Sequence, residues 1–203
     1  TNTIELLQPV TPFSGHCQSL YGAASQEFIS ELEYWQEMKE RMNECGEVCS
    51  NSAEGQENIQ WMTASFDASK FQLTGSLAGF KEEELLLTAT AIGMSAVHGK
   101  INSAVCLESH GREVPGLDST DTVGWCTAQF PFSVNVDPHS TLFEQTQEIA
   151  NIRATVPSNG VGFGILKAAK KLNISYPKTM LVYQGRLDSA SHNFEFGKNN
   201  FKE

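Results

Sequence analysis

Basic residues are scarce in this chain of 203 residues. Fourteen lysines and arginines stand against 24 aspartates and glutamates, which gives a formal net charge of −10. Binding to nucleic acids without sequence preference needs lysine and arginine to neutralise phosphates. An anionic membrane surface would repel the same negative charge. We therefore expect neither a nucleic-acid partner nor a membrane partner.

Long apolar runs are also missing. Short ones such as Leu85–Leu87 fall far below the ~20 residues that a membrane-spanning helix requires. The opening residues combine no basic segment with an apolar stretch of the kind that signal peptides carry. We therefore expect no membrane span and no signal peptide.

Cysteine pairs at metal-binding spacing are absent as well. The chain contains no Cys-x-x-Cys pair and no histidines placed to complete a zinc site, so we expect no metal. Cys45 and Cys49 are four residues apart, and a local disulfide between them stays open as an alternative. The other cysteines are Cys17, Cys106 and Cys126.

The remaining composition is that of a globular protein. Hydrophobic residues make up 40% of the chain, so one domain of this length can bury a substantial core. Apolar residues from Phe28 to Met42 recur every three or four positions and predict an amphipathic helix. The segment from Glu82 to His98 has acidic residues in its first turn and Gly99 after its end, which predicts a second helix.

A strand is expected directly after this second helix. The alternation from Ile101 to Glu108 places Glu108 on the face opposite Val105 and Leu107, where a carboxylate can line a cleft. A capping box, Thr-Leu-Phe-Glu, opens a further helix. Other strands are expected at 59–66, 70–73, 122–136, 180–185 and 193–196, and other helices at 141–152 and 165–172.

Two blocks of sequence carry the strongest functional signal. The first is Leu-Glu-Ser-His-Gly-Arg-Glu at 107–113, and the second is Thr-Val-Gly-Trp-Cys-Thr-Ala-Gln-Phe-Pro at 122–131. They resemble the Glu-Gly-His-Gly-Arg-Glu and Arg-Thr-Val-Gly-Trp-Phe-Thr-x-x-Tyr-Pro motifs of epimerization domains in nonribosomal peptide synthetases. Those domains belong to the wider condensation-domain superfamily.

Three further segments resemble motifs of the same family in the same order. Residues 84–89 resemble its acidic-x-Leu-Leu-x-Ala helix, residues 157–164 its Pro-x-x-Gly-x-Gly-Tyr-Gly motif, and residues 182–188 a drifted Phe-Asn-Tyr-Leu-Gly-Gln-Phe-Asp. The alternate glycines of residues 157–164 predict unusual backbone torsions or a close backbone approach. The family's catalytic His-His-x-x-x-Asp motif has no counterpart, because no two histidines are adjacent here. The chain thus resembles the C-terminal half of an epimerization domain.

This resemblance implies a fold and a partner. The fold is α/β: residues 1–203 would form one lobe of the chloramphenicol-acetyltransferase-like architecture, with a mixed sheet flanked by helices. In the family this lobe meets an N-terminal lobe across a cleft. Because a lone lobe exposes apolar surface, we expect a complementary N-terminal lobe, a second chain or a homo-oligomer as its partner.

The resemblance also assigns roles to residues. Glu108 is the expected catalytic proton-transfer group, since α-proton exchange needs a base on one face of the substrate and a proton donor on the other. Ser109, Trp125 and Tyr183 are expected to line the substrate tunnel. Ser109 occupies a position where the family has glycine. Structural roles fall to the remaining motif residues, His110, Arg112, Gly124, Gly160, Gly162 and Gly164.

Ordinary structural interpretations compete with these roles. Glu108 can be a solvated carboxylate at a strand end, and Trp125, in a β-rich segment, is foremost a core residue. Arg112 can pair with a carboxylate and hold the strand end. Cys126 can be imagined as a nucleophile paired with His110, but a buried structural thiol is favoured.

Three functions follow from the resemblance. The first is α-carbon epimerization of a carrier-bound aminoacyl or peptidyl thioester, which this chain performs only when paired with a histidine-bearing lobe. The second is noncatalytic, the binding of a small ligand or a partner chain, and the third is condensation-type amide bond formation. No cofactor is bound directly, because the phosphopantetheine arm belongs to a peptidyl carrier protein. A synthetase implies the cytoplasm, although the cysteines also fit a secreted protein.

Overall fold

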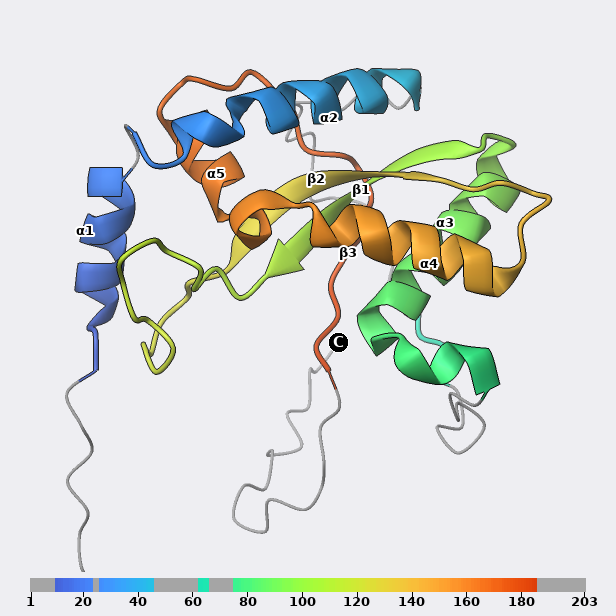
Figure 1. Cartoon of the computed structure of the whole chain (residues 1–203), viewed down its shortest axis with the longest axis horizontal. Coiled ribbons are helices and arrows are strands. Elements are labelled where there is room, and N and C mark those ends of the chain that lie inside the picture. Colours follow the sequence, from blue (N-terminus) through green and yellow to red (C-terminus); the bar gives the residue numbers. More distant parts are fainter. Residues whose placement is uncertain (1–9, 24–25, 46–61, 66–74, 186–203) are drawn as a thin grey trace, which may run out of the picture.

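The computed structural model describes residues 10–23, 26–45, 62–65 and 75–185. These residues form a three-stranded sheet of order β2-β1-β3 that lies among helices (Figure 1). Strands β1 (Asn102–Ser109) and β2 (Ala128–Asn135) are antiparallel, whereas β3 (Met180–Leu181) runs parallel to β1. The mixed sheet flanked by helices confirms the predicted α/β fold class.

Helices pack against the strands of the sheet. In Figure 1, α2 runs across the top of the molecule and α4 lies alongside the strands. Helices α2 and α5 contact β2, while α3 contacts both β1 and α4. The α-helices are α1 (Phe13–Ala23), α2 (Leu32–Glu44), α3 (Glu82–His98), α4 (Leu142–Ala154) and α5 (Val161–Ala168). Short 3₁₀ turns are η1 (Ile29–Glu31), η4 (Gly75–Gly79) and η5 (Pro157–Gly160).

An aromatic cluster fills the core between the sheet and two helices. Leu107 of β1 pairs with Phe130 of β2 in the ladder, and both side chains are buried. Trp35 of α2 lies with its ring centroid 6.2 Å from that of Phe130 and 5.1 Å from that of Phe163 in α5. Burial of each such side chain contributes about 1.5–3 kcal/mol. This cluster fixes α2 and α5 against β2.

The helix limits that local sequence signals predict are largely confirmed. Helix α3 spans the expected residues and ends at Gly99, whose φ of +65° suits glycine. Thr141 caps α4: its Oγ1 accepts from the backbone N–H of Glu144, and the Glu144 carboxylate accepts from the backbone N–H of Thr141. The predicted helix from Phe28 to Met42 is present as η1 followed by α2.

The helix expected at 165–172 was placed wrongly. Helix α5 begins four residues earlier, at Val161, and ends at Ala168, so that Gly162 and Gly164 lie within it. Of the three alternate glycines, only Gly160 has a positive φ, +90°. Gly162 has a packing role, because a Cβ there would lie 2.0 Å from Glu31 Oε2. The positive φ of Gly160 and the close approach at Gly162 confirm what the alternate glycines predicted, although the helix begins within the motif rather than after it.

Two strand predictions were too long, and a core prediction was wrong. β2 begins only at Ala128, and β3 contains two residues instead of six. Trp125 lies in the loop before β2 and is 87% exposed, so it is not a core residue. That loop is held by contacts with distant residues: the Thr122 carbonyl accepts from Arg112, and the Thr122 hydroxyl donates to the Thr11 carbonyl.

Other predictions lie mainly outside the described residues. The strands expected at 70–73 and 193–196 fall there, as does Cys49 of the possible disulfide. Of the strand expected at 59–66, residues 62–65 are described and form no strand. Cys45 is buried, and its thiol donates to the Arg41 carbonyl at 3.3 Å.

Helix α1 contains a buried histidine. His16 is 1% exposed, and neither ring nitrogen has a hydrogen-bond partner in the described structure. Close by, the Phe13 ring packs over Gly124, where a Cβ would lie 2.3 Å from the ring. Burial, followed by the positive charge of Arg112, lowers the pKa of His16 below its usual 6.5.

The depressed pKa of His16 predicts that acid destabilises the fold. The unfolded chain binds a proton near pH 6.5 and the folded chain does not, so the free energy of unfolding falls as the pH drops below about 6.5. It stops falling at the pKa of the folded state. We expect His16→Leu to flatten this part of the profile, measured by urea unfolding at about pH 7.5 and about pH 5.5. His139→Gln, at an exposed position, is the control. Equal slopes for His16→Leu and the wild type would contradict the prediction.

Candidate functional site

A hollow of about 530 Å³ opens where β1 and β3 end. The two strands are parallel, so their carboxyl ends meet at one edge of the sheet, the usual location of binding sites in α/β folds. Tyr183, just beyond β3, is brought there beside Glu108, near the end of β1. Ser109, His110 and Arg112 also line the hollow. The structure therefore gathers five of the ten predicted site residues in this hollow.

Glu108 has the orientation that the strand alternation predicts. It pairs with Gln129 in the antiparallel ladder, and Gln129 Nε2 donates a hydrogen bond to Glu108 Oε2 at 3.3 Å. Leu107 packs on the opposite, core face. Glu108 is half-buried, and no other described side chain hydrogen-bonds its carboxylate. The carboxylate can therefore act on a molecule in the hollow.

The two predicted tunnel residues that line this hollow are both tied to other elements. Ser109 Oγ donates to the backbone carbonyl of Asn159, in η5, at 2.8 Å. Its hydroxyl thus joins β1 to the turn before α5. The Tyr183 hydroxyl donates to a carboxylate oxygen of Glu82, at the start of α3. These contacts set two walls of the hollow.

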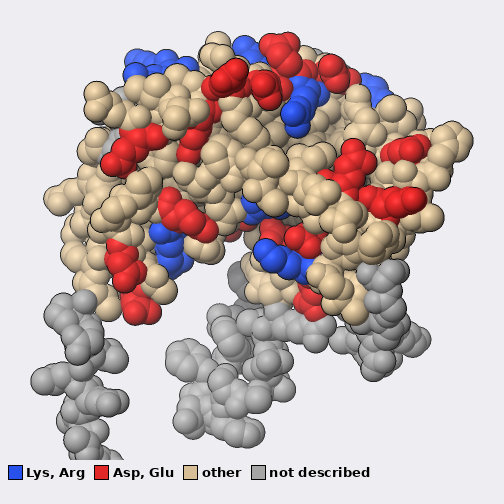
Figure 2. Space-filling model, in the orientation of Figure 1, with Lys and Arg blue, Asp and Glu red and all other residues tan. Residues whose placement is uncertain are grey.

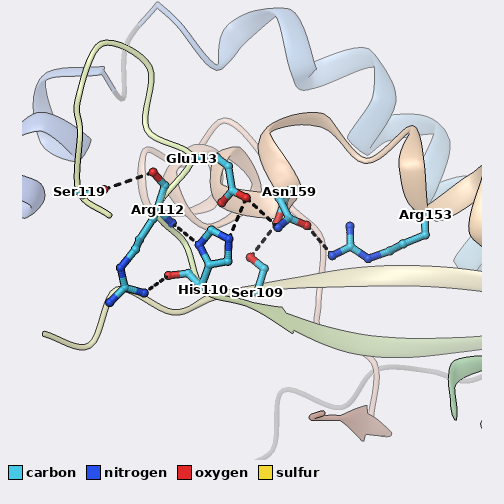
Figure 3. A network of polar contacts seen from close by, with 7 residues as sticks. All are labelled: Ser109, His110, Arg112, Glu113, Ser119, Arg153 and Asn159. Atoms are coloured by element: carbon cyan, nitrogen blue, oxygen red, sulfur yellow. Dashed lines mark hydrogen bonds and ion pairs between the residues drawn. The ribbon is translucent and has the colours of Figure 1, made fainter. Parts of the chain in front are cut away.

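His110 belongs to a polar network that Figure 3 shows from close by. Its Nε2 donates to Glu113 Oε1 at 3.1 Å, and its Nδ1 accepts from the backbone N–H of Arg112 at 3.2 Å. These partners fix one neutral tautomer, with the proton on Nε2. Asn159 Nδ2 also donates to Glu113 Oε1, at 3.0 Å, and Asn159 Oδ1 accepts from Arg153. His110 is thus held in this network through both of its ring nitrogens.

Arg112 holds the strand end, but not through a carboxylate as the sequence suggested. Its guanidinium donates to the carbonyls of His110 and Thr122, at 3.3 and 3.1 Å. Its own carbonyl accepts from Ser119 Oγ at 3.2 Å. These contacts close the loop between β1 and β2. They hold the strand end in place of the ion pair that the sequence suggested.

Trp125 lines a second hollow, of about 320 Å³, rather than the one that contains Glu108. Gly164 also lines this second hollow, and nothing lies within 4 Å of a Cβ added there. Cys126 is buried, and both ring nitrogens of His110 are engaged elsewhere. The imagined pairing of Cys126 with His110 is therefore absent.

A second thiol shares a strand face with Glu108 without taking part in chemistry. Burial, and next the charge of Glu108, raise the pKa of Cys106 to about 11, so the thiol stays protonated at neutral pH.

Within the described ranges, no group of three histidine, cysteine or acidic side chains is placed to hold a metal ion. Figure 2 shows acidic side chains spread over several elements, with basic ones singly or in small groups. Glu83 and Glu108 are the carboxylates that line the hollow at the end of β1.

The condensation-domain family model matches residues 4–202. The chain belongs to the condensation-domain family. Its curated relatives are synthetases: bacitracin synthase 2 of Bacillus licheniformis is 28% identical over 177 residues, which are 82% of this chain and 7% of that protein. N-(5-amino-5-carboxypentanoyl)-L-cysteinyl-D-valine synthase of Amycolatopsis lactamdurans is 36% identical over 106 residues, 51% of this chain and 3% of that protein. The chain therefore spans less than a tenth of either relative.

The fold of this condensation-family chain is similar to that of a solved structure. The epimerization domain from the third module of tyrocidine synthetase B matches with a TM-score of 0.60 and 20% identity, over 81% of this chain and 40% of that one. The shared fold is the chloramphenicol-acetyltransferase-like architecture that the motifs implied. The chain thus corresponds to less than half of that domain.

Sequence reasoning missed three residues of this condensation-family site. Glu113, Arg153 and Asn159 join the network of Figure 3 but carried no assigned role. Asn159 could have been noticed, because Asn-Gly marks a turn in which asparagine tolerates the left-handed region. Arg153 gave no such signal: its guanidinium lies 5.2 Å from the Phe130 ring centroid, a contact between α4 and β2 that local sequence does not reveal.

Proposed function

We propose that this chain supplies the Glu108 side of an epimerization site that acts on the α-carbon of a carrier-bound aminoacyl or peptidyl thioester. The proposal rests on one observation: a half-buried carboxylate with a single side-chain hydrogen bond lines a hollow at the carboxyl ends of two parallel strands. A carboxylate so placed can accept or return an α-proton. The motif around it, which resembles that of epimerization domains, supports this choice over amide bond formation.

The proposal requires a companion. Inversion needs a second proton-transfer group on the other face of the α-carbon. Of the other proton-transfer groups of the hollow, His110 binds Glu113 and Arg112, and Tyr183 binds Glu82. Glu83, in the first turn of α3, also lines the hollow, but it belongs to the same lobe as Glu108. A lobe that carries a His-His-x-x-x-Asp segment is the complement we infer, together with a peptidyl carrier protein that presents the thioester. As part of a synthetase, the assembly would work in the cytoplasm.

Deuterium exchange tests the proposal. The native material is first examined by native mass spectrometry for a second polypeptide, or a longer one, that contains the histidine segment. A carrier protein loaded with an aminoacyl thioester is then incubated in D₂O with the chain alone and with that companion. We expect uptake of one deuterium and formation of the D-epimer only with the companion.

Three other outcomes would contradict the proposal. Exchange by the chain alone would remove the need for a companion. A new amide bond without exchange would favour condensation chemistry. A companion that binds this chain, but produces neither exchange nor an amide bond, would favour a noncatalytic role in binding or assembly.

A further inference from the structure

Asn159 forms hydrogen bonds with three different parts of the chain around the Glu108 hollow. Its backbone carbonyl accepts from Ser109 Oγ, its Nδ2 donates to Glu113 Oε1, and its Oδ1 accepts from Arg153. These contacts reach the end of β1, the following loop and α4. Figure 3 shows its side chain between Glu113 and Arg153. One amide thus uses its donor and its acceptor on two different elements.

The backbone at Asn159 is held in a costly conformation. Ser158 and Asn159 have φ values of +44° and +47°, in the left-handed region that residues other than glycine seldom adopt. Gly160 follows at +90°, packed so closely on Phe130 that a Cβ would lie 1.9 Å from the ring. Strained residues persist where the surroundings enforce them, and they occur preferentially at functional sites.

A buried carboxylate enforces this turn from far away in the sequence. Glu31 is 6% exposed, and its Oε1 accepts from Ser158 Oγ at 2.6 Å. Its Oε2 accepts from Trp35 Nε1 at 3.0 Å. A buried carboxylate is tolerated only when it is hydrogen-bonded in this way. Glu31 therefore fixes Ser158, and with it the neighbouring Asn159, to the start of α2.

We propose that Asn159 is a positioning residue for the Glu108 site, an inference that rests on the function proposed above. Held by the turn, its amide fixes Glu113, which fixes the His110 ring, which accepts the backbone N–H of Arg112. Its carbonyl fixes Ser109, the neighbour of Glu108. Asn159 touches no reacting atom and acts through these residues on the position of the carboxylate.

The test separates positioning from folding with Asn159→Gly. Glycine accepts the positive φ without strain, which offsets the lost side-chain hydrogen bonds, so we expect little change in the urea unfolding midpoint. In the assembly with the companion lobe, we expect kcat for α-proton exchange to fall about tenfold with KM nearly unchanged, because the loss of two hydrogen bonds affects the geometry of the reacting step. Lys170→Gly, at an exposed residue with φ of +57° outside the network, is the matched control.

A second readout needs no activity. Hydrogen exchange of the Arg112 amide, followed by NMR on the full chain, should accelerate about tenfold in Asn159→Gly and stay unchanged in Lys170→Gly, because the former loosens the ring that accepts this N–H. Wild-type exchange at Arg112 would overturn the inference, as would parallel losses of stability and activity. If the wild-type assembly fails to exchange the α-proton, the proposed function is wrong. The hydrogen-exchange rate of the Arg112 amide then decides by itself whether Asn159 positions this network.

Discussion

Glu108→Gln is expected to slow α-proton exchange by roughly 10²–10⁴-fold in the assembly with a histidine-bearing lobe, since it removes the group that transfers the proton. Glutamine has the shape of glutamate, and its carbonyl oxygen can still accept from Gln129 Nε2 as the carboxylate does. We therefore expect the free energy of unfolding to change by no more than about 0.5 kcal/mol. Deuterium uptake by the carrier-bound thioester, measured by mass spectrometry, gives the rate.

The control for this variant removes an equal charge elsewhere. Glu148 is exposed on α4 and does not line the hollow, so Glu148→Gln should leave the exchange rate unchanged. Exchange by Glu108→Gln at the wild-type rate would show that Glu108 is only a solvated carboxylate at a strand end, the alternative that the sequence left open.

Gly111→Ala is expected to destabilise the fold by about 3 kcal/mol or more, the sum of left-handed strain and overpacking. Gly111 has a φ of +66°, and a Cβ there would lie 1.8 Å from the backbone oxygen of Cys126 and 3.0 Å from the backbone nitrogen of Ala128. These are backbone atoms just before β2 and at its first residue, so no side-chain rotation relieves the clash. The melting temperature should fall by roughly 6–12 °C, which calorimetry measures.

Gly116→Ala isolates the torsional part of this effect. Gly116 has a φ of +71°, but no atom lies within 4 Å of a Cβ added there. The loss should then be only about 1–2 kcal/mol, the left-handed strain alone. Equal losses for the two variants would mean that the loop at Gly111 moves aside, and that the close approach to Cys126 does not hold the two strands together.

The local sequence predicted the elements whose signals are themselves local. Acidic residues in the first turn and Gly99 at the end gave the limits of α3, and the capping box at Thr141 gave the start of α4. Alternation along β1 gave the orientation of Glu108. In each case, residues only a few positions apart decide the outcome, so no knowledge of the rest of the chain was needed.

Local signals failed where distant contacts decide the conformation. Trp125 belongs to a β-rich stretch, yet its loop is held by Thr11, Thr122 and Arg112 rather than by a ladder, and the indole is exposed. The glycine-rich segment after Gly160 forms a helix that packs closely on Glu31 in η1, an approach that a Cβ at position 162 would block. Hydrophobic and β-forming character alone cannot distinguish these outcomes.

The sequence by itself determined the fold class, the family motifs and the candidacy of Glu108, because these follow from short-range patterns and from residue identity. The tertiary structure decided what surrounds that carboxylate. Only the parallel pairing of β1 and β3 brings Tyr183 to it, and only the packing of α2 on β2 and α5 lets Glu31 hold the turn that carries Asn159. Such contacts join residues up to 127 positions apart, and chain folding alone places them within hydrogen-bonding distance.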